Sequence, residues 1–170
     1  ALPILRWRAA DLVGGGDPAG TAGEGGTLAC YLRPMDAKLL AAIESLHQPS
    51  DWVHLSTIGR DGAPHVTPMM MGVLAPHLLF SLTGKQKVRN LERDPRACVA
   101  ISRPTVMAHV IVWGRIDIRV DDEAQEIWEA MITKAFGADG LGARSRRLSR
   151  EGTMLGLLTP ERHRIYGIES

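Results

Sequence analysis

A chain of 170 residues with 45% apolar side chains is long enough for one domain with a sizeable core. A formal net charge of +1 argues against a general nucleic-acid binder, and no apolar run approaches the length that spans a membrane. The two cysteines, Cys30 and Cys98, lie far apart and outside any zinc-binding spacing, which fits a reducing cytoplasm without a structural metal.

Residues 1–34 differ in amino-acid composition from the rest of the chain, with a GGG run and the glycine-rich stretch AGTAGEGG. Such a composition cannot bury enough apolar surface to order itself. We expect this segment to be an N-terminal extension, either disordered by itself or introduced by cloning. A single folded domain is expected over residues 35–170, because the composition changes at Met35.

Beyond Met35 the elements are short and follow one another closely. In chain order we expect a helix at 36–46, strands at 52–58, 64–73 and 77–82, a basic helix at 85–93, strands at 97–102 and 106–120, a helix at 121–136, a loop at 137–152, and strands at 154–158 and 163–168. Apolar periodicity gives the helices and strands, Pro95 ends the basic helix, and Pro160 separates the last two strands. Strands in hairpin spacing with two or three helices predict an antiparallel barrel, and an open α+β sheet with one helical face is the alternative.

A strand ends and a basic helix begins between Ser81 and Asn90. Backbone N–H groups at a helix N-terminus are unpaired and the helix dipole favours negative charge, so this turn can hold an anion. Lys85 and Lys87 add positive charge and Thr83 adds a hydroxyl, which together suit a phosphate monoester or diester. The alternative is a solvated start of a basic helix, and spacing alone favours it.

The predicted strand at 64–73 contains Pro68 followed by Met69, Met70 and Met71. Proline removes a backbone donor, which predicts that the strand is an edge strand or is bulged there. A flat aromatic ligand could lie along such a strand and bind its backbone groups at the rim. Core packing combined with a dimer contact is the alternative, and spacing alone favours that alternative as well.

The histidines form no metal-binding or catalytic constellation, with neither an HExxH motif nor an i, i+4 pair. They are His47, His54, His65, His77, His109 and His163. No GxSxG or SxxK motif and no pair of acids on a plausible cleft wall is present either. We therefore expect no metal ligand and no catalytic residue of the chain's own, so that any catalysis depends on a bound cofactor.

Several motifs of this chain resemble the pyridoxamine 5'-phosphate oxidase-like, flavin-binding split-barrel superfamily, in particular its flavin and deazaflavin (F420) oxidoreductase branch. They are LST at 55–57, GRDGAPHVTP at 59–68, LFS at 79–81, KQKVRNLERDPR at 85–96, WGRI at 113–116 and TPER at 159–162. The most specific of them is KxRNLxRDPR. The resemblance covers about residues 36–168.

This resemblance implies a mainly β, six-stranded antiparallel split barrel with flanking helices, working as a homodimer with each cofactor in a cleft between subunits. Lys85 and Lys87 would bind the cofactor phosphate. The turn residues Ser81, Leu82 and Thr83 would border the phosphate and the sugar alcohol. The strand residues Pro68, Met69 and Met70 would meet the polar edge of the ring through backbone groups. Trp113 would reach the other subunit's site.

The implied function is an oxidoreductase that transfers hydride between bound FMN or coenzyme F420 and a small conjugated substrate. The arginine-rich substrate clamp of true pyridoxamine-phosphate oxidases has no counterpart here, so that activity is not expected. Leu82-Thr83 replaces the aromatic-Thr pair common in FMN-binding members, which favours F420 slightly. A non-catalytic flavin or haem carrier of the same fold is the alternative, with His65 or His109 as iron ligands.

Overall fold

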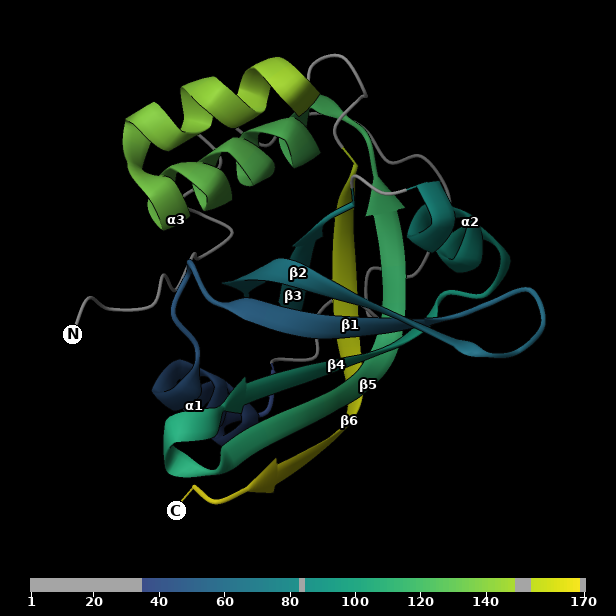
Figure 1. The fold of residues 1–170 in the computed structure, drawn as a ribbon, viewed down its shortest axis with the longest axis vertical. Coiled ribbons are helices and arrows are strands. Elements are labelled where there is room, and N and C mark those ends of the chain that lie inside the picture. The colour runs from purple at the N-terminus through teal and green to yellow at the C-terminus, as the bar shows by residue number, and fades with distance from the viewer. Residues whose placement is uncertain (1–34, 83–84, 149–153, 169–170) are drawn as a thin grey trace, which may run out of the picture.

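The computed structural model describes residues 35–82, 85–148 and 154–168 (Figure 1). The expected N-terminal extension and Thr83 lie outside the described residues. The elements, in chain order, are α1 (Ala37–Leu46), β1 (Trp52–Ile58), β2 (Pro64–Leu74), β3 (His77–Ser81), α2 (Lys85–Arg93), β4 (Arg96–Arg103), a 3-10 turn (Pro104–Val106), β5 (Ala108–Arg119), α3 (Asp122–Leu148) and β6 (Leu155–Tyr166).

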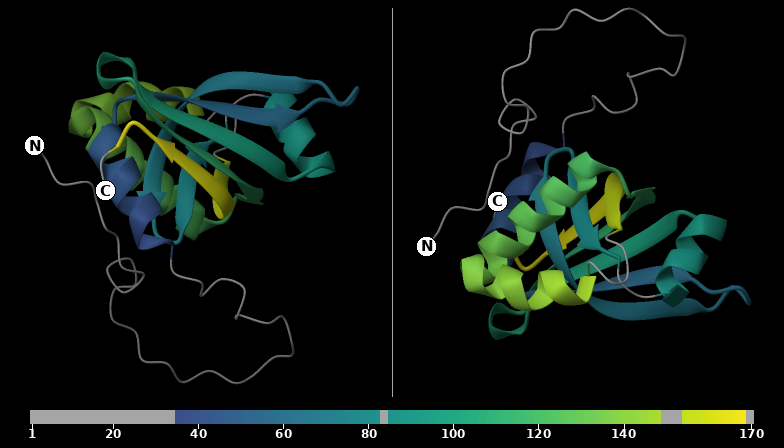
Figure 2. Two further views of the ribbon diagram at one scale, coloured as in Figure 1. Left: turned by 90° about the horizontal axis from the view of Figure 1, so that it is seen from below. Right: turned by 90° about the horizontal axis from the view of Figure 1, so that it is seen from above.

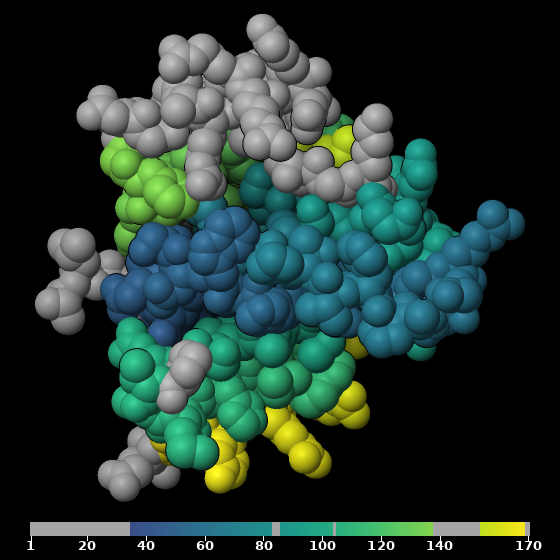
Figure 3. Space-filling model, viewed as in Figure 1, coloured from purple at the N-terminus to yellow at the C-terminus, as the bar shows by residue number. Residues whose placement is uncertain are grey.

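The strands close into an antiparallel barrel in the order β1-β2-β3-β6-β5-β4. In the described part of the chain the barrel has six strands with three flanking α-helices. This confirms the predicted antiparallel barrel, and it excludes the open sheet because β1 and β4 pair with each other. The β1–β2 hairpin projects from one side of the molecule (Figures 1 and 3).

The barrel interior holds the main hydrophobic core, which period-two alternation fills from every strand. On β1, for example, Val53 and Leu55 are buried in the core while Trp52 and His54 are exposed. Helices α1 and α2 cover opposite ends of the barrel (Figure 2) and insert apolar side chains into the same core. These include Ile43 of α1 and Leu91 of α2. The barrel and two of its helices are thus one packed unit.

Helix α3 covers an outer face of the barrel through a second hydrophobic cluster. Trp128, fully buried on α3, packs in this cluster with Met70 of β2, Leu79 of β3 and Leu157 of β6. The strands β2, β3 and β6 are therefore buried on both faces where α3 lies over them.

The structure corrects the predicted loop at residues 137–152, because α3 continues as a helix to Leu148. Gly137 has a positive φ of 72° and divides the helix into two arms (Figure 1). Glycine adopts this backbone conformation without steric cost. The glycine- and arginine-rich composition predicted a loop, but the only break in the helix over the described residues of this segment is the kink at Gly137.

The predicted break at Pro160 is also wrong, because β6 is a single strand from Leu155 to Tyr166. Pro160 pairs with Gly114 at a register shift, where β5 advances by one residue between Trp113 and Gly114 while β6 passes from Arg162 to Pro160. A bulge tolerates proline, since the ladder hydrogen bond is interrupted there in any case. A side chain on Gly114 would collide with the Thr159 carbonyl, so glycine permits this close pairing.

The other boundaries differ by a few residues from those predicted. The expected strand at 106–120 begins only at Ala108, after the 3-10 turn, and Leu82 follows the end of β3. Within the described ranges, no helix has the length and apolar character needed to cross a membrane.

Candidate functional site

One half of β2 has a strand neighbour on one side only. Residues 64–70 pair with β1, whereas β3 pairs only with Met71–Leu74. No described strand therefore pairs with the other side of residues 64–69. Pro68 lies in this open segment, exposed and opposite His54, which confirms its predicted place at a strand edge. Backbone polar groups on such an edge need partners from outside the sheet.

Three of the predicted site residues have their side chains in the core. Met69 and Leu82 pack inside the barrel, and Met70 packs beneath α3. The Leu82 N–H donates to the Met154 carbonyl at 2.8 Å. Only backbone groups of these residues can therefore face a ligand, which agrees with the expected role of Met69 and Met70 but leaves no side-chain contact to Leu82.

Ser81 ends β3 and is tied to α3. The buried indole Nε1–H of Trp128 donates to Ser81 Oγ at 2.8 Å. In this bond Ser81 Oγ is the acceptor, so its own hydrogen is not used by Trp128. Its predicted neighbour Thr83 and the side chain of Lys85 lie outside what the structure describes, although Lys85 is the first residue of α2.

Lys87 lies in the first turn of α2 and is only 7% exposed. No carboxylate among the described residues pairs with it, and burial lowers the pKa of its ammonium group. A buried ammonium is costly unless acceptors surround it. The first N–H groups of the adjoining helix have no partner within the helix, and its first turn contains no acidic residue. Oxygen atoms of an anion would complement both features, and the burial contradicts a solvated face for Lys87.

A polar network that the sequence analysis did not single out holds α2 on the barrel. Fully buried Asn90 donates from Nδ2 to Thr57 Oγ1 on β1 at 3.0 Å and accepts from Gln86 Nε2 at 2.9 Å. Asn90 belongs to the KxRNLxRDPR motif, and this motif was the one feature of the sequence that pointed to Asn90. Its partner on β1 could not be identified without the fold.

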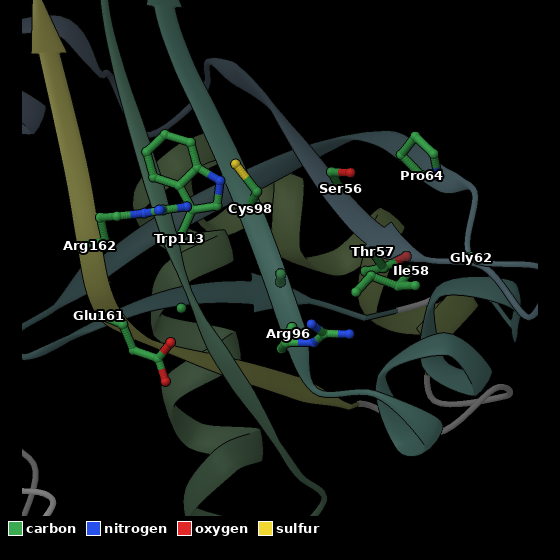
Figure 4. A pocket seen from close by; sticks show the side chains of 12 residues that line it. Ser56, Thr57, Ile58, Gly62, Pro64, Arg96, Cys98, Trp113, Glu161 and Arg162 are labelled. Atoms are coloured by element: carbon green, nitrogen blue, oxygen red, sulfur yellow. The ribbon is translucent and has the colours of Figure 1, made fainter.

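A hollow of about 550 Å³ opens on the outer face of β1, β4, β5 and β6 (Figure 4). The Arg162 guanidinium lies over the Trp113 ring at 4.3 Å from its centroid. Cys98 lines the same hollow, and burial raises the pKa of its thiol despite the nearby Arg162. Trp113 is thus placed in a surface hollow of its own subunit, at the β5–β6 bulge.

A second hollow of about 570 Å³ lies between the β1–β2 hairpin and α2. Its lining includes His65, Gln86 and Asn90. Neither hollow contains the predicted cofactor residues Pro68, Ser81 or Lys87. Among the described residues, no group of three or more His, Cys, Asp or Glu side chains could hold a metal ion.

The closed barrel, the open edge of β2 and the basic first turn of α2 together define a split-barrel protein. The family model for pyridoxamine 5'-phosphate oxidase matches residues 39–161, most of the described chain. The chain therefore belongs to the pyridoxamine 5'-phosphate oxidase family. No curated protein matches it.

Solved structures share the fold at low identity. A protein of unknown function from Agrobacterium tumefaciens is 24% identical with a TM-score of 0.62, over 76% of this chain and 56% of that one. This chain thus spans little more than half of that relative. An F420 reductase is 23% identical with a TM-score of 0.56, over 71% of this chain and 94% of that one. A haem-binding protein from Mycobacterium smegmatis is 23% identical with a TM-score of 0.59, over 80% and 55%.

Proposed function

We propose that this protein is a flavin- or deazaflavin-dependent oxidoreductase that acts on a small conjugated substrate. The family supports this class, since the solved structures that share its fold include an F420 reductase. The proposal includes a homodimer whose two subunits share each cofactor site. A true pyridoxamine-phosphate oxidase is not proposed, because the chain lacks the late arginine clamp.

The observation that carries the proposal is the burial of Lys87 in the first turn of α2, where no carboxylate of the described residues pairs with it. A lysine that only solubilised a helix would extend into water, because hydration of the ammonium is strongly favourable. A phosphate offers charge and several acceptor oxygens, and it also accepts from N–H groups of the helix N-terminus. FMN and coenzyme F420 both contain a phosphate next to a sugar alcohol.

The open edge of β2 fits the other end of such a cofactor. Flavin and deazaflavin rings have a polar rim of carbonyl and N–H groups, which matches the side of β2 near Pro68 and Met69 that no described strand pairs with. We assign the phosphate to Lys85 and Lys87, the sugar alcohol to the turn at 81–83, and the ring edge to residues 68–70. When bound, the ring supplies two-electron hydride chemistry. The chain's residues bind it, orient it and limit access of water.

We favour coenzyme F420 over FMN for this site. The residue before Thr83 is Leu82, whose side chain is buried in the barrel core and cannot replace the aromatic ring common in FMN-binding members. The similarity to an F420 reductase agrees with this choice, although at 23% identity it is evidence of fold alone.

Exposed apolar side chains on the outside of the barrel support the homodimer. Trp52 on β1 is 59% exposed, Val66 on β2 is 56% exposed and Tyr166 on β6 is 62% exposed. Trp52 and Val66 lie on paired strands, whereas Tyr166 lies on β6, which pairs with neither β1 nor β2. Exposed large apolar side chains on neighbouring strands are typical of interaction surfaces. A single partner could therefore cover both Trp52 and Val66.

Equilibrium binding of FMN and of coenzyme F420 to the purified protein, followed by fluorescence, tests the proposal. We expect tight binding of coenzyme F420, weaker binding of FMN, and hydride transfer to conjugated enones or quinones. Tight binding without turnover of any acceptor would favour the carrier function instead. Failure to bind either compound would refute the proposal, and a haem titration would then test the haem-binding alternative.

A further inference from the structure

The hydrogen bond between Asn90 and Thr57 lies among apolar side chains where α2 packs on the barrel. Asn90 has no exposed surface, and Thr57 is 2% exposed. Their neighbours Val88 and Leu91 join the main hydrophobic core. Apolar contacts are non-directional and allow a helix to rotate or slide. A buried amide–hydroxyl bond of 3.0 Å is directional and fixes one orientation.

The orientation of Asn90 also determines that of Lys87. The two residues are three positions apart on α2, so they lie on the same face of the helix. Both are buried, which agrees with this placement. A rotation of α2 that broke the bond to Thr57 would therefore turn Lys87 as well. A second contact at the other end of the helix, from the Arg93 guanidinium to the Ile58 carbonyl, prevents the helix from moving away but acts a full turn or more from Lys87.

Thr57 connects this helix to the strand with the open edge. It lies opposite His65 of β2 in the strand register and opposite Ala97 of β4. Its hydroxyl has the His65 carbonyl as acceptor at 3.5 Å, a long contact that contributes less than the bond to Asn90. The connection therefore runs from Gln86 in the first turn of α2, through Asn90 and Thr57, to residue 65 in the open segment of β2.

We infer that Thr57 and Asn90 are positioning residues of the cofactor site, which set the phosphate-binding turn of α2 at a fixed distance and rotation from the ring-binding edge of β2. This inference rests on the proposed function, because it assigns the two ends of the site as above. Neither residue needs to touch the cofactor. The link acts by holding Lys87 where the phosphate of a cofactor already seated on β2 can reach it.

The test uses cofactor pairs that differ in the phosphate. FMN is compared with riboflavin, and coenzyme F420 with the phosphate-free deazaflavin that keeps only the ribityl chain, on the full chain. Thr57→Val removes the hydroxyl at almost constant volume, and Thr57→Ser restores it. Ile43→Val, a buried residue of α1 remote from α2, serves as the control for a general loss of stability. Thr57→Ala removes the same hydroxyl and replaces Thr57→Val should the valine variant not fold.

We expect Thr57→Val to lower the affinity ratio of the phosphate form to the phosphate-free form by about tenfold, the size of one lost buried hydrogen bond. Thr57→Ser should restore the ratio, and Ile43→Val should leave it unchanged. The ratio stays unchanged if Thr57→Val weakens both forms equally or weakens neither, and either result would overturn the inference. A general structural role would affect both forms alike.

Hydrogen exchange of α2 in the cofactor-free protein separates this inference from the proposed function. Thr57→Val should raise exchange in residues 85–93 relative to α1, and Thr57→Ser should not. If the wild-type protein bound neither cofactor, the proposed function would fail, and an unchanged exchange pattern would in addition overturn the link between β1 and α2.

Discussion

The indole of Trp128 on α3 donates a hydrogen bond of 2.8 Å to the hydroxyl of Ser81 at the end of β3. Ser81→Ala would leave the buried indole N–H without an acceptor. We predict a loss of about 1–2 kcal/mol in the free energy of unfolding, within the range for an unsatisfied buried donor. Urea denaturation of the cofactor-free protein measures it.

A double-mutant cycle with Trp128→Phe tests whether the loss comes from this bond. The two substitutions should be coupled by about 0.5–1.5 kcal/mol, because the second has no bond left to break. Ser45→Ala is a suitable control, since the Ser45 hydroxyl bonds only to the Ala42 carbonyl of its own helix in the described structure and the residue is exposed. Simple additivity would mean that Ser81 contributes little through Trp128.

Lys87→Met should have opposite effects on the empty and the loaded protein. In the cofactor-free protein it removes a buried cation that no described carboxylate pairs with, and we predict a gain of about 1 kcal/mol in the free energy of unfolding. Cofactor affinity should fall by about 1.5–3 kcal/mol, the range for a hydrogen bond to a charged group. Thermal denaturation and a fluorescence titration measure the two effects.

The matched control for Lys87→Met is Arg89→Met. Arg89 also carries a positive charge on α2, but its side chain is exposed. Arg89→Met should weaken cofactor binding far less than Lys87→Met. Unchanged affinity in Lys87→Met would remove the phosphate from this turn and with it the main support for the proposed function.

Local patterns in the sequence were enough to predict most of the barrel. Alternation such as that of Val53 and Leu55 on β1 reports burial directly, because successive strand residues face opposite sides. Pro68 predicted a strand edge for a similarly local reason, the missing N–H. The sequence pattern therefore sufficed wherever the type of a single residue decides whether it is buried in the core or exposed at the surface.

The rest depended on contacts between distant residues. The burial of Lys87 runs against the usual exposure of lysine, and Asn90 acquires its role only when Thr57, far away in sequence, lies opposite it. The bulge that carries Pro160 through β6 requires Gly114 on the neighbouring strand. Local periodicity in the sequence does not reveal which distant residues become partners. The motif therefore predicted the residues of the candidate site but not their arrangement.

Val66→Glu should weaken the proposed homodimer. Val66 is 56% exposed on the outer face of β2, and a partner subunit covering it would bury an unpaired carboxylate in the variant. We predict a dimer for the wild-type protein at micromolar concentration and a monomer for Val66→Glu, measured by light scattering. Arg60→Gln, an exposed change on the same hairpin that lowers the net charge by the same one unit, is the control for charge alone. A monomeric wild-type protein would contradict a site shared between subunits.

His47 makes the stability of the barrel depend on pH. This buried imidazole, at the end of α1, bonds through Nε2 to the Met71 carbonyl at 2.9 Å, and within the described residues its Nδ1 has no partner. Burial lowers the pKa of His47 below its ordinary value of about 6.5, against smaller opposing effects of the Met71 carbonyl and Asp51. Between these two pKa values the unfolded chain binds more protons, so stability is fully present above pH 6.5 and is lost as the pH falls through the folded-state value.

His47→Gln keeps a donor for the Met71 carbonyl and removes the titration. We predict that the wild-type protein loses up to about 1.4 kcal/mol per pH unit more than this variant once the pH falls below 6.5, the slope for one proton. Urea denaturation at a series of pH values measures the difference. His77, whose pKa burial also lowers, is present in both proteins and cancels from the comparison. Parallel stability curves for the two proteins would show that His47 is not protonated on unfolding in this range.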